Sequence, residues 1–412
     1  MQTQLAPQFQ GTPEGQEAEA ILRKCVHCGF CTATCPTYQI LGDELDGPRG
    51  RIYLIKQVLE GAQPTRKTQL HLDRCLTCRN CESTCPSGVQ YGHLVDIGRK
   101  IVDGQVERPG GEKLLRGALS HGLNSALFAP AMKLGQSVRA LLPRKLRDKV
   151  PAPQSAGTWP TATHERRVLM LAGCVQPAMQ PNINTATARV LDAAGIQTVI
   201  AAQAGCCGGV KFHLNDQDGG LSQMRANIDA WWPYIEQGVE ALVVNASGCG
   251  VTVKEYGHLL RHDPEYADKA RRISELTRDL SEMLPDIVPA LSGKVEAAAR
   301  DLGTIAYHPP CTLQHGQQLR GGVEQHLGQL GFDIRLSPVE SHLCCGSAGT
   351  YSVLQPEISG QLRERKLGHL AALQPRAIVS ANVGCITHLQ SGTDTPVRHW
   401  VELLDQCLAQ AT

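Results

Sequence analysis

The cysteines of this chain fall into repeated strings, and these strings constrain the fold more than any other feature. One kind of string has three cysteines spaced by two residues, then three residues and a Cys-Pro pair. It occurs twice, and the second copy lies 50 residues after the first, which indicates an internal repeat. This spacing is typical of [4Fe–4S] cluster ligands. The positions are Cys25, Cys28, Cys31 and Cys35, then Cys75, Cys78, Cys81 and Cys85.

The spacing also predicts which cysteines share a cluster. In two-cluster ferredoxins the fourth cysteine of each string binds the cluster of the other string. The short spacings let a loop wrap around one cluster, so that backbone amides point at the sulfurs. Pro36 and Pro86 have a fixed φ and no N–H, so they turn the chain away after the last ligand. We expect one cluster on Cys25, Cys28, Cys31 and Cys85, and the other on Cys75, Cys78, Cys81 and Cys35.

A second kind of string combines a lone cysteine, a Cys-Cys-Gly triplet and a Gly-Cys pair. Its two copies are offset by 136 to 138 residues, which indicates a duplicated domain. Gly208 and Gly346 would give the backbone the freedom for a tight loop at each triplet. We expect these cysteines to hold one or two further iron–sulfur clusters. They are Cys174, Cys206, Cys207 and Cys249, then Cys311, Cys344, Cys345 and Cys385.

Short apolar segments precede most of these cysteines and predict strands. In an open parallel sheet, ligands bind in the crevice outside the carboxyl ends of the strands, so cysteines that follow strands converge there. Each copy is therefore predicted to be an α/β unit. The expected strands are 167–171, 198–201, 241–244, 304–307 and 377–379, and a helix is expected over 187–194.

The fold class that follows is mixed: an α-helical two-cluster ferredoxin domain, then a duplicated α/β cysteine-rich domain. A chain of 412 residues is long enough for two or three domains. The aromatic content of 4% predicts cores of Ala, Val, Leu and Ile. The expected divisions are an N-terminal tail (1–20), the ferredoxin domain (21–105), a helical linker (106–163), lobe 1 (164–285) and lobe 2 (300–412).

Composition excludes several other classes of protein. A net charge of +1 provides no field to hold nucleic acid. The N-terminal residues 1–16 contain no apolar signal region, and no run approaches the roughly 18 apolar residues of a membrane helix. We therefore expect a cytoplasmic protein. Disulfides are rare in that compartment, and structural zinc sites use two separated ligand pairs, so neither explains these strings.

Several residues leave two interpretations open. A helix is predicted within 48–60, with Ile52, Tyr53, Ile55, Val58 and Leu59 at helical spacing. Arg49 and Arg51, at its start, either neutralise cluster charge or dock a partner, or are solvated.

In the linker, an apolar stripe with a basic end at 141–149 either packs on a partner or on the chain's own core, or lies on an anionic membrane surface. The stripe comprises Leu114, Leu115, Leu119, Leu123, Leu127 and Phe128.

Three further side chains near the strings carry predictions. His308 and His388 either ligate a cluster or donate a proton to quinone, or are hydrogen-bonding neighbours. Cys407, outside all strings, shares a helix face with Trp400 and Leu404 and is expected in the core.

Four stretches resemble the iron–sulfur subunits of the membrane-associated bacterial glycolate oxidases (glycolate dehydrogenases). They are CVHCGFCTATCPTYQILGDELDGPRGRIYLIKQVLEG, HLDRCLTCRNCESTCPSGV, ASGCGVTVKEYG and SHLCCGSAGTY, and they cover the ferredoxin part and both lobes. The resemblance implies a peripheral protein on the cytoplasmic face of the inner membrane. It would pass electrons toward quinone from FAD-containing partner subunits that oxidise glycolate, with D-lactate as a further substrate. No residue is expected to be catalytic, and the chain alone would not act on substrate.

The lobes depart from one relative of this family, the heterodisulfide reductases. Their last element is Cys-x-x-Cys, whereas here Thr252 and His388 stand where the second cysteine would be. The missing thiolates argue against a paired noncubane cluster and disulfide-cleaving chemistry.

Other functions remain as alternatives. The chain would equally suit a lactate or anaerobic glycerol-3-phosphate dehydrogenase, because the flavin subunit selects the substrate. No G-x-G-x-x-G opens a helix after a strand, so this chain is not expected to bind the flavin itself. A non-catalytic iron–sulfur sensor or scaffold is disfavoured, because no DNA-binding motif is present.

Overall fold

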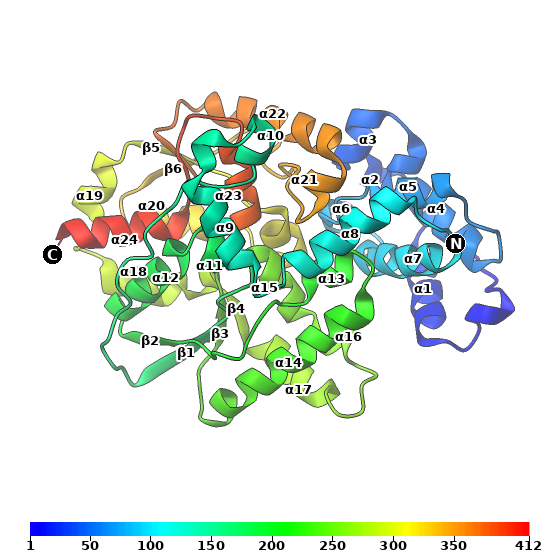
Figure 1. Cartoon of the computed structure of the whole chain (residues 1–412), viewed down its shortest axis with the longest axis horizontal. Coiled ribbons are helices and arrows are strands. Elements are labelled where there is room, and N and C mark those ends of the chain that lie inside the picture. Colours follow the sequence, from blue (N-terminus) through cyan, green and yellow to red (C-terminus); the bar gives the residue numbers. More distant parts are fainter. Residues whose placement is uncertain (412) are drawn as a thin grey trace.

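The N-terminal part of the protein is helical and sits at one end of the molecule (Figure 1). The computed structural model describes residues 1–411. Thr12 caps the first helix by accepting a hydrogen bond from the Gly15 amide, and Pro13 occupies its first turn. The helices are α1 (Pro13–Lys24), α2 (Phe30–Ala33), α3 (Pro36–Leu41), α4 (Pro48–Leu59), α5 (Arg66–Asp73), α6 (Asn80–Thr84) and α7 (Tyr91–Gln105).

The helix predicted within 48–60 is α4, and its apolar face packs against α1 and α7. Ile52, Ile55 and Leu59 are buried together with Leu94 of α7. Tyr53 does not join them and is exposed, because it lies on the opposite side of α4. This face of α4 therefore contributes aliphatic side chains to the helical core.

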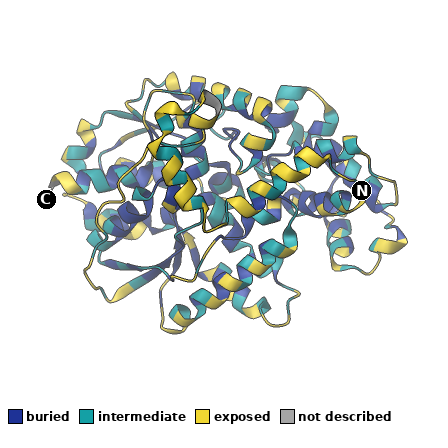
Figure 2. Ribbon diagram, viewed as in Figure 1, coloured by how far each residue is buried: buried dark blue, intermediate teal, exposed yellow. Residues whose placement is uncertain are grey.

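The linker forms short helices that cross the face of the lobes (Figures 1 and 2). They are α8 (Gly110–Gly122), α9 (Phe128–Ser137) and α10 (Arg144–Arg147), and the side chains of residues 144 and 145 lie outside the described ones. Leu114 and Leu127 are each 75% exposed, so these two members of the stripe do not pack on the chain's own core. The described residues include no helix that is both long and apolar enough to cross a membrane.

Lobe 1 is built on a four-stranded parallel sheet of order β2-β1-β3-β4. Its strands are β1 (Arg166–Met170), β2 (Ile196–Val199), β3 (Leu242–Val244) and β4 (Thr277–Asp279). Its helices are α11 (Gln176–Met179), α12 (Asn182–Ala193), α13 (Gly209–His213), α14 (Gln217–Glu236), α15 (Ser247–Lys254), α16 (Tyr256–Leu259) and α17 (Ala267–Leu276).

Lobe 2 repeats this topology with the order β6-β5-β7-β8, again all parallel. Its strands are β5 (Thr304–Tyr307), β6 (Asp333–Leu336), β7 (Ala377–Ser380) and β8 (Val397–His399). A π-helical turn, Thr312–Gly316, follows Cys311 directly. The helices are α18 (Leu284–Leu291), α19 (Glu296–Asp301), α20 (Gly322–Gln329), α21 (Tyr351–Leu354), α22 (Pro356–Ala371), α23 (Val383–Gln390) and α24 (Trp400–Ala411).

The two sheets share one hydrophobic core, and Cys407 is fully buried in it, which confirms its predicted place. The strand predicted at 198–201 was placed two residues late, because β2 begins directly after Gly195. Its extent is set by pairing with β1, from Arg166 opposite Ile196 to Leu169 opposite Val199. Beyond Val199 the chain leaves the sheet and runs toward the Cys-Cys-Gly triplet.

Charged side chains attach the helical part to lobe 1. Arg79, between two cysteines of the second string, forms an ion pair with Glu255 in which Nη2 donates to Oε2 at 2.8 Å. The ring of His93 (α7) stacks on that of His258 (α16), with centroids 4.0 Å apart. Burial opposes the charge of Glu255, but the hydrogen bond from His93 and the Arg79 guanidinium hold its pKa well below the usual range.

Glu255→Gln is expected to lower the free energy of unfolding by about 3 kcal/mol, because Arg79 is left buried without its countercharge. The two side chains are only 11% and 22% exposed, so water cannot replace the lost carboxylate. Urea unfolding of anaerobically purified protein measures the change. Asp268→Asn, in the exposed pair with Arg271, is the control and should have no measurable effect. An equal free energy of unfolding for the two variants would contradict the stabilising role of the Arg79–Glu255 pair.

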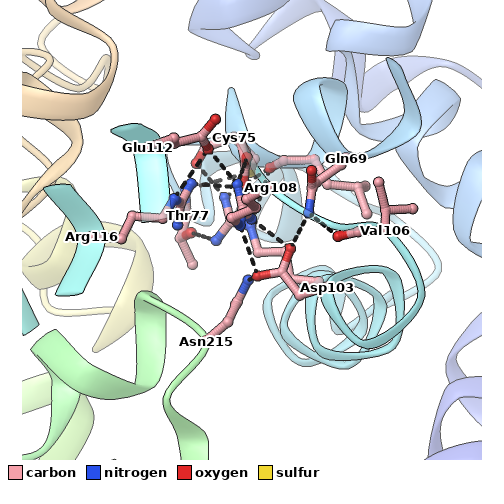
Figure 3. Close-up of polar contacts among 12 residues, drawn as sticks. Gln69, Cys75, Thr77, Asp103, Val106, Arg108, Glu112, Arg116 and Asn215 are labelled. Carbon is pink, nitrogen blue, oxygen red and sulfur yellow. Dashed lines mark hydrogen bonds and ion pairs between the residues drawn. The ribbon is translucent and has the colours of Figure 1, made fainter. Parts of the chain in front are cut away.

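A second ionic cluster joins the same parts around Arg108 (Figure 3). Its guanidinium donates to Asp73 at 2.6 Å and also pairs with Asp103 and Glu112. Asn215, from lobe 1, donates to Asp103. One cluster therefore connects α5, α7, α8 and lobe 1, close to the loop that carries Cys75 and the residues after it.

Candidate functional site

Two cavities in the helical part bring the cysteines of both strings together. The cysteines around each cavity come from different strings, and Cys81 borders both cavities. Cys85 of the second string lies among first-string cysteines, and Cys35 of the first string lies among second-string cysteines. Cys25, Cys28, Cys31, Cys81 and Cys85 line cavity 1, and Cys35, Cys75, Cys78 and Cys81 line cavity 2.

The loops around the cavities adopt matching backbone conformations. His27 and Thr77, which occupy equivalent positions in the two strings, both have positive φ, as do Gly29 and Arg79. Positive φ is unfavourable for residues other than glycine, and such backbone strain is typical of functional loops. It turns amides inward, so the Thr77 N–H lies 3.4 Å from the Cys75 sulfur. Amide hydrogen bonds of this kind stabilise the negative charge of a cluster.

Arg51 corrects one of the sequence interpretations, because its side chain is only 1% exposed and is not solvated. It lines cavity 2, donates to the carbonyl oxygen of His71 at 2.7 Å, and lies 3.4 Å from the Asp46 carboxylate. Arg49 is half-exposed, pairs with Glu44, and lines cavity 1. The two arginines therefore belong to different cavities and different environments.

Tyr91 is a site residue that the sequence did not reveal. Its side chain is buried, lines both cavities, and its hydroxyl donates to the Cys75 sulfur at 3.5 Å. It stands at the start of α7, five residues after Pro86, and no spacing or motif distinguishes it from an ordinary core tyrosine.

The eight cysteines of the lobes gather into one group in each lobe. In lobe 1, Cys206 contacts Cys174 and Cys207, and Cys207 in turn contacts Cys249. In lobe 2, the Cys311 and Cys344 sulfurs are 3.7 Å apart, and Cys345 contacts Cys385. All of these cysteines are free of disulfides and follow strand ends, as in the crevice that a parallel sheet predicts.

The glycine of each triplet makes the tight cysteine loop possible. Gly208 and Gly346 both have a φ of +90°, a backbone conformation that residues other than glycine rarely adopt. The Gly346 amide lies 3.4 Å from the Cys344 sulfur, and a Cβ at this residue would come within 2.5 Å of the Ser359 carbonyl oxygen. There is room here for backbone only.

Gly346→Ala is expected to cost about 1–3 kcal/mol of stability through backbone strain, and the clash with Ser359 adds to this. Because the loop carries Cys344 and Cys345, the variant should also lose the iron of lobe 2. Thermal unfolding and iron analysis measure both effects. Gly360→Ala in the neighbouring helix α22 meets no atom within 4 Å and should be neutral or stabilising. Full iron content in Gly346→Ala would contradict the assignment.

The donor sets fit iron–sulfur clusters. All sixteen side chains are thiols, the soft ligands that clusters require, and most are buried away from water. Burial raises the pKa of Cys31 to about 11, with a further contribution from Cys25, so a thiolate forms there only with a cation beside it. Iron in each cavity would supply that charge.

The four cysteine groups are neighbours in a row. Cavities 1 and 2 share Cys81 and Tyr91. An apolar cluster then joins Cys78 to Cys311 and Cys344 of lobe 2, and burial together with the nearby Cys311 raises the pKa of Cys78. From lobe 2, backbone contact continues to lobe 1.

The contact between the lobes runs through residues next to ligand cysteines. The Ser247 amide donates to the Ala381 carbonyl oxygen at 3.0 Å, and its hydroxyl lies 2.7 Å from that of Thr312. Ser247 is two residues before Cys249, and Thr312 follows Cys311. Residues next to the ligand cysteines of both lobes thus meet at the interface between the lobes.

The two candidate histidines of lobe 2, His308 and His388, differ in their surroundings. His388 Nε2 lies 3.2 Å from the Ser359 hydroxyl, which favours the interpretation as a hydrogen-bonding neighbour. His308 is buried beside Cys345 and Cys385.

Comparison with known proteins supports the division seen in the structure. A model of the 4Fe-4S dicluster domain matches residues 21–89, and a model of the cysteine-rich domain matches 168–254 and 305–390. The chain is 55% identical over 410 residues to the glycolate oxidase iron-sulfur subunit of Escherichia coli (strain K12), covering 99% of both chains.

Two more distant relatives extend the comparison. The probable glycolate oxidase iron-sulfur subunit of Bacillus subtilis (strain 168) is 29% identical over 407 residues, covering 91% of this chain and 90% of the relative. Lactate utilization protein A of Geobacillus thermodenitrificans (strain NG80-2) is 27% identical over 252 residues, covering 58% of this chain and 98% of the relative.

Proposed function

The chain belongs to the family of glycolate oxidase iron–sulfur subunits, and from this premise we propose that it conducts electrons out of a glycolate-oxidising complex through a row of iron–sulfur centres. The observation that carries the proposal is the continuity of the four cysteine groups. Bound clusters would supply one-electron transfer, and the protein supplies their ligands, their order and their insulation from water.

The ligands we propose for the helical part are the crossover sets. One [4Fe–4S] cluster is held by Cys25, Cys28, Cys31 and Cys85 in cavity 1, and the second by Cys75, Cys78, Cys81 and Cys35 in cavity 2. Tyr91, the Thr77 amide and the buried guanidinium of Arg51 stabilise negative charge in cavity 2. The domain divisions 21–105, 164–285 and 300–412 follow these sites.

Lobe 2 is proposed to accept electrons from the helical part before lobe 1. The support is the packing of Cys78 against Cys311 and Cys344, because electron transfer is fastest between neighbouring centres. In lobe 1, by contrast, Cys174, Cys206 and Cys207 interact with one another and with Cys249. Each lobe would hold one cluster, to which its four cysteines offer thiolates.

Substrate oxidation is assigned to partner subunits that carry FAD, so the chain alone does not oxidise glycolate. This assignment rests on the lack of a dinucleotide-binding motif and on the naming of the Escherichia coli relative as one subunit of an oxidase. Quinone is the proposed final acceptor. Lactate is the second candidate substrate of the complex, because 58% of the chain aligns with a lactate utilization protein.

The exposed leucines of the linker support peripheral association with the cytoplasmic face of the inner membrane. Leu114 of α8, Leu127 just before α9, and Leu134 of α9 are exposed to solvent, and Leu141 is 85% exposed near the basic segment that follows. Apolar side chains next to basic ones favour an anionic lipid surface.

Dye reduction by glycolate tests the function. The isolated chain, the FAD partners and the assembled complex are compared under anaerobic conditions with an acceptor that takes electrons only from iron–sulfur centres. The proposal predicts activity in the complex alone. Glycolate-dependent reduction by the isolated chain, or undiminished quinone reduction by the partners without it, would overturn the proposal.

A further inference from the structure

His308 lies at the end of β5, against the cysteines of lobe 2. One ring nitrogen of His308 and the sulfurs of Cys345 and Cys385 all lie within 4.8 Å of one another, close enough to share a metal. All three side chains are buried. Neutral imidazole and thiolate are the two ligand types that iron and zinc sites combine most readily.

The surroundings of His308 leave its ring without a polar partner. The side chain is 1% exposed, and neither Nδ1 nor Nε2 has a hydrogen-bond partner among the described residues. Buried polar atoms of native proteins are usually paired with a protein group, an ordered water or an ion, so two unpaired nitrogens beside two thiols point to a bound metal.

The backbone holds this histidine firmly in place. The His308 amide donates to the Val379 carbonyl oxygen at 2.8 Å, and the Ser380 hydroxyl donates to the His308 carbonyl oxygen at 2.9 Å. Both partners belong to β7, the central strand that leads toward Cys385. The ring is thus anchored between two strand ends, facing the donors of the site.

We propose that His308 is a nitrogen ligand of the iron–sulfur centre in lobe 2, together with thiolates of Cys345 and Cys385. The inference rests on the proposed function, since it requires that lobe 2 binds a cluster. With Cys311 and Cys344, lobe 2 then offers five donors: four thiolates and one imidazole.

Lobe 1 has no equivalent of this ligand. The duplication offset of 137 residues places Leu171, a buried apolar residue, at the position of His308. The lobe 1 centre is therefore held by thiolates only. Histidine ligation raises the reduction potential of a cluster relative to cysteine ligation, so the two lobes would differ in potential although their folds match. Lobe 2, which contacts Cys78, would be the stronger electron acceptor.

Histidine-specific ¹⁵N labelling tests the ligand in the unmodified protein. Anaerobically purified chain, reduced stepwise, is examined by pulsed EPR, and signals absent from Cys345→Ser are assigned to lobe 2. The inference predicts a strongly coupled nitrogen in the lobe 2 signal that changes with the isotope. A lobe 2 signal without histidine nitrogen coupling would overturn it.

Two variants provide the matched comparison. His308→Leu installs the residue that lobe 1 carries, and should abolish the coupling and lower the lobe 2 midpoint potential. His388→Gln alters another buried histidine of the lobe, which is hydrogen-bonded to Ser359, and should retain the coupling. ⁵⁷Fe Mössbauer spectra, which need no paramagnetic centre, should show one altered iron site in His308→Leu. Identical spectra would contradict the inference.

Failure of this inference is distinguishable from failure of the proposed function. If lobe 2 contains iron and accepts electrons in the complex but shows no histidine nitrogen, only the assignment of His308 is wrong. If lobe 2 contains no iron while the complex is fully active, the proposed order of centres is wrong as well.

Discussion

Cys35→Ser is expected to remove the cluster of the second string, although Cys35 belongs to the first. Cys35 lines cavity 2 with Cys75 and Cys78, and its sulfur lies 3.2 Å from the Thr37 hydroxyl at the same cavity. The variant should lose about four iron atoms per chain, the content of one cubane cluster. Quinone reduction by the complex should fall to background, because the link between cavity 1 and lobe 2 is broken.

Two single-string variants identify which cluster is lost. Cys28 borders only cavity 1, and Cys78 borders only cavity 2. The EPR spectrum of Cys35→Ser should therefore match that of Cys78→Ser and differ from that of Cys28→Ser. The EPR spectrum of Cys85→Ser should instead match that of Cys28→Ser and differ from that of Cys78→Ser. If Cys35→Ser lacked the same EPR signal as Cys28→Ser, each string would bind its own cluster, and the crossover assignment would be wrong.

Arg51→Met is expected to lower both the stability of the protein and the reduction potential of the cluster in cavity 2. The buried guanidinium pairs with Asp46, and breaking a buried pair by removing one partner costs about 3–5 kcal/mol. A cation beside a cluster stabilises the more negative, reduced form, so its loss shifts the potential downward. Urea unfolding and an EPR-monitored redox titration measure the two effects.

Matched substitutions separate charge from geometry at this site. Arg51→Lys keeps the cation but cannot reproduce the forked contacts to Thr37 and the His71 carbonyl, so it should retain most of the potential and lose stability. Arg49→Gln, at the half-exposed arginine of cavity 1, should leave the cavity 2 potential unchanged. An unchanged potential in Arg51→Met would contradict the role of the guanidinium.

The cysteine pattern was predictable because cluster ligation is a local property. Spacings of two and three residues define a loop around each cluster, and the 50-residue repeat points to a second one. The strands of the lobes were predictable for a similar reason, since short apolar runs precede the cysteines. β5 matches its predicted range, whereas β2 is displaced because its pairing with β1, not its composition, sets its limits.

What the sequence left open depends on distant contacts. An arginine at a helix start looks solvated, and only the fold places the carboxylate of Asp46 and the carbonyl of His71 against Arg51. The packing of Cys78 on Cys311 joins residues more than 200 positions apart, and no periodicity signals it. The same holds for His308, whose lack of a partner is visible only in three dimensions.

Rapid freeze-quench EPR of the assembled complex is the most direct test of the central claim, that this chain conducts electrons from the flavin subunits through the helical part to lobe 2. The complex is mixed with glycolate anaerobically, without quinone, and frozen at intervals shorter than one turnover. The account predicts that the two electrons released by one glycolate appear on the two [4Fe–4S] clusters and the lobe 2 centre, shared among them, within a single turnover, and that the lobe 2 signal is absent in Cys78→Ser. Glyoxylate formation at the full rate while these centres stay oxidised would contradict it.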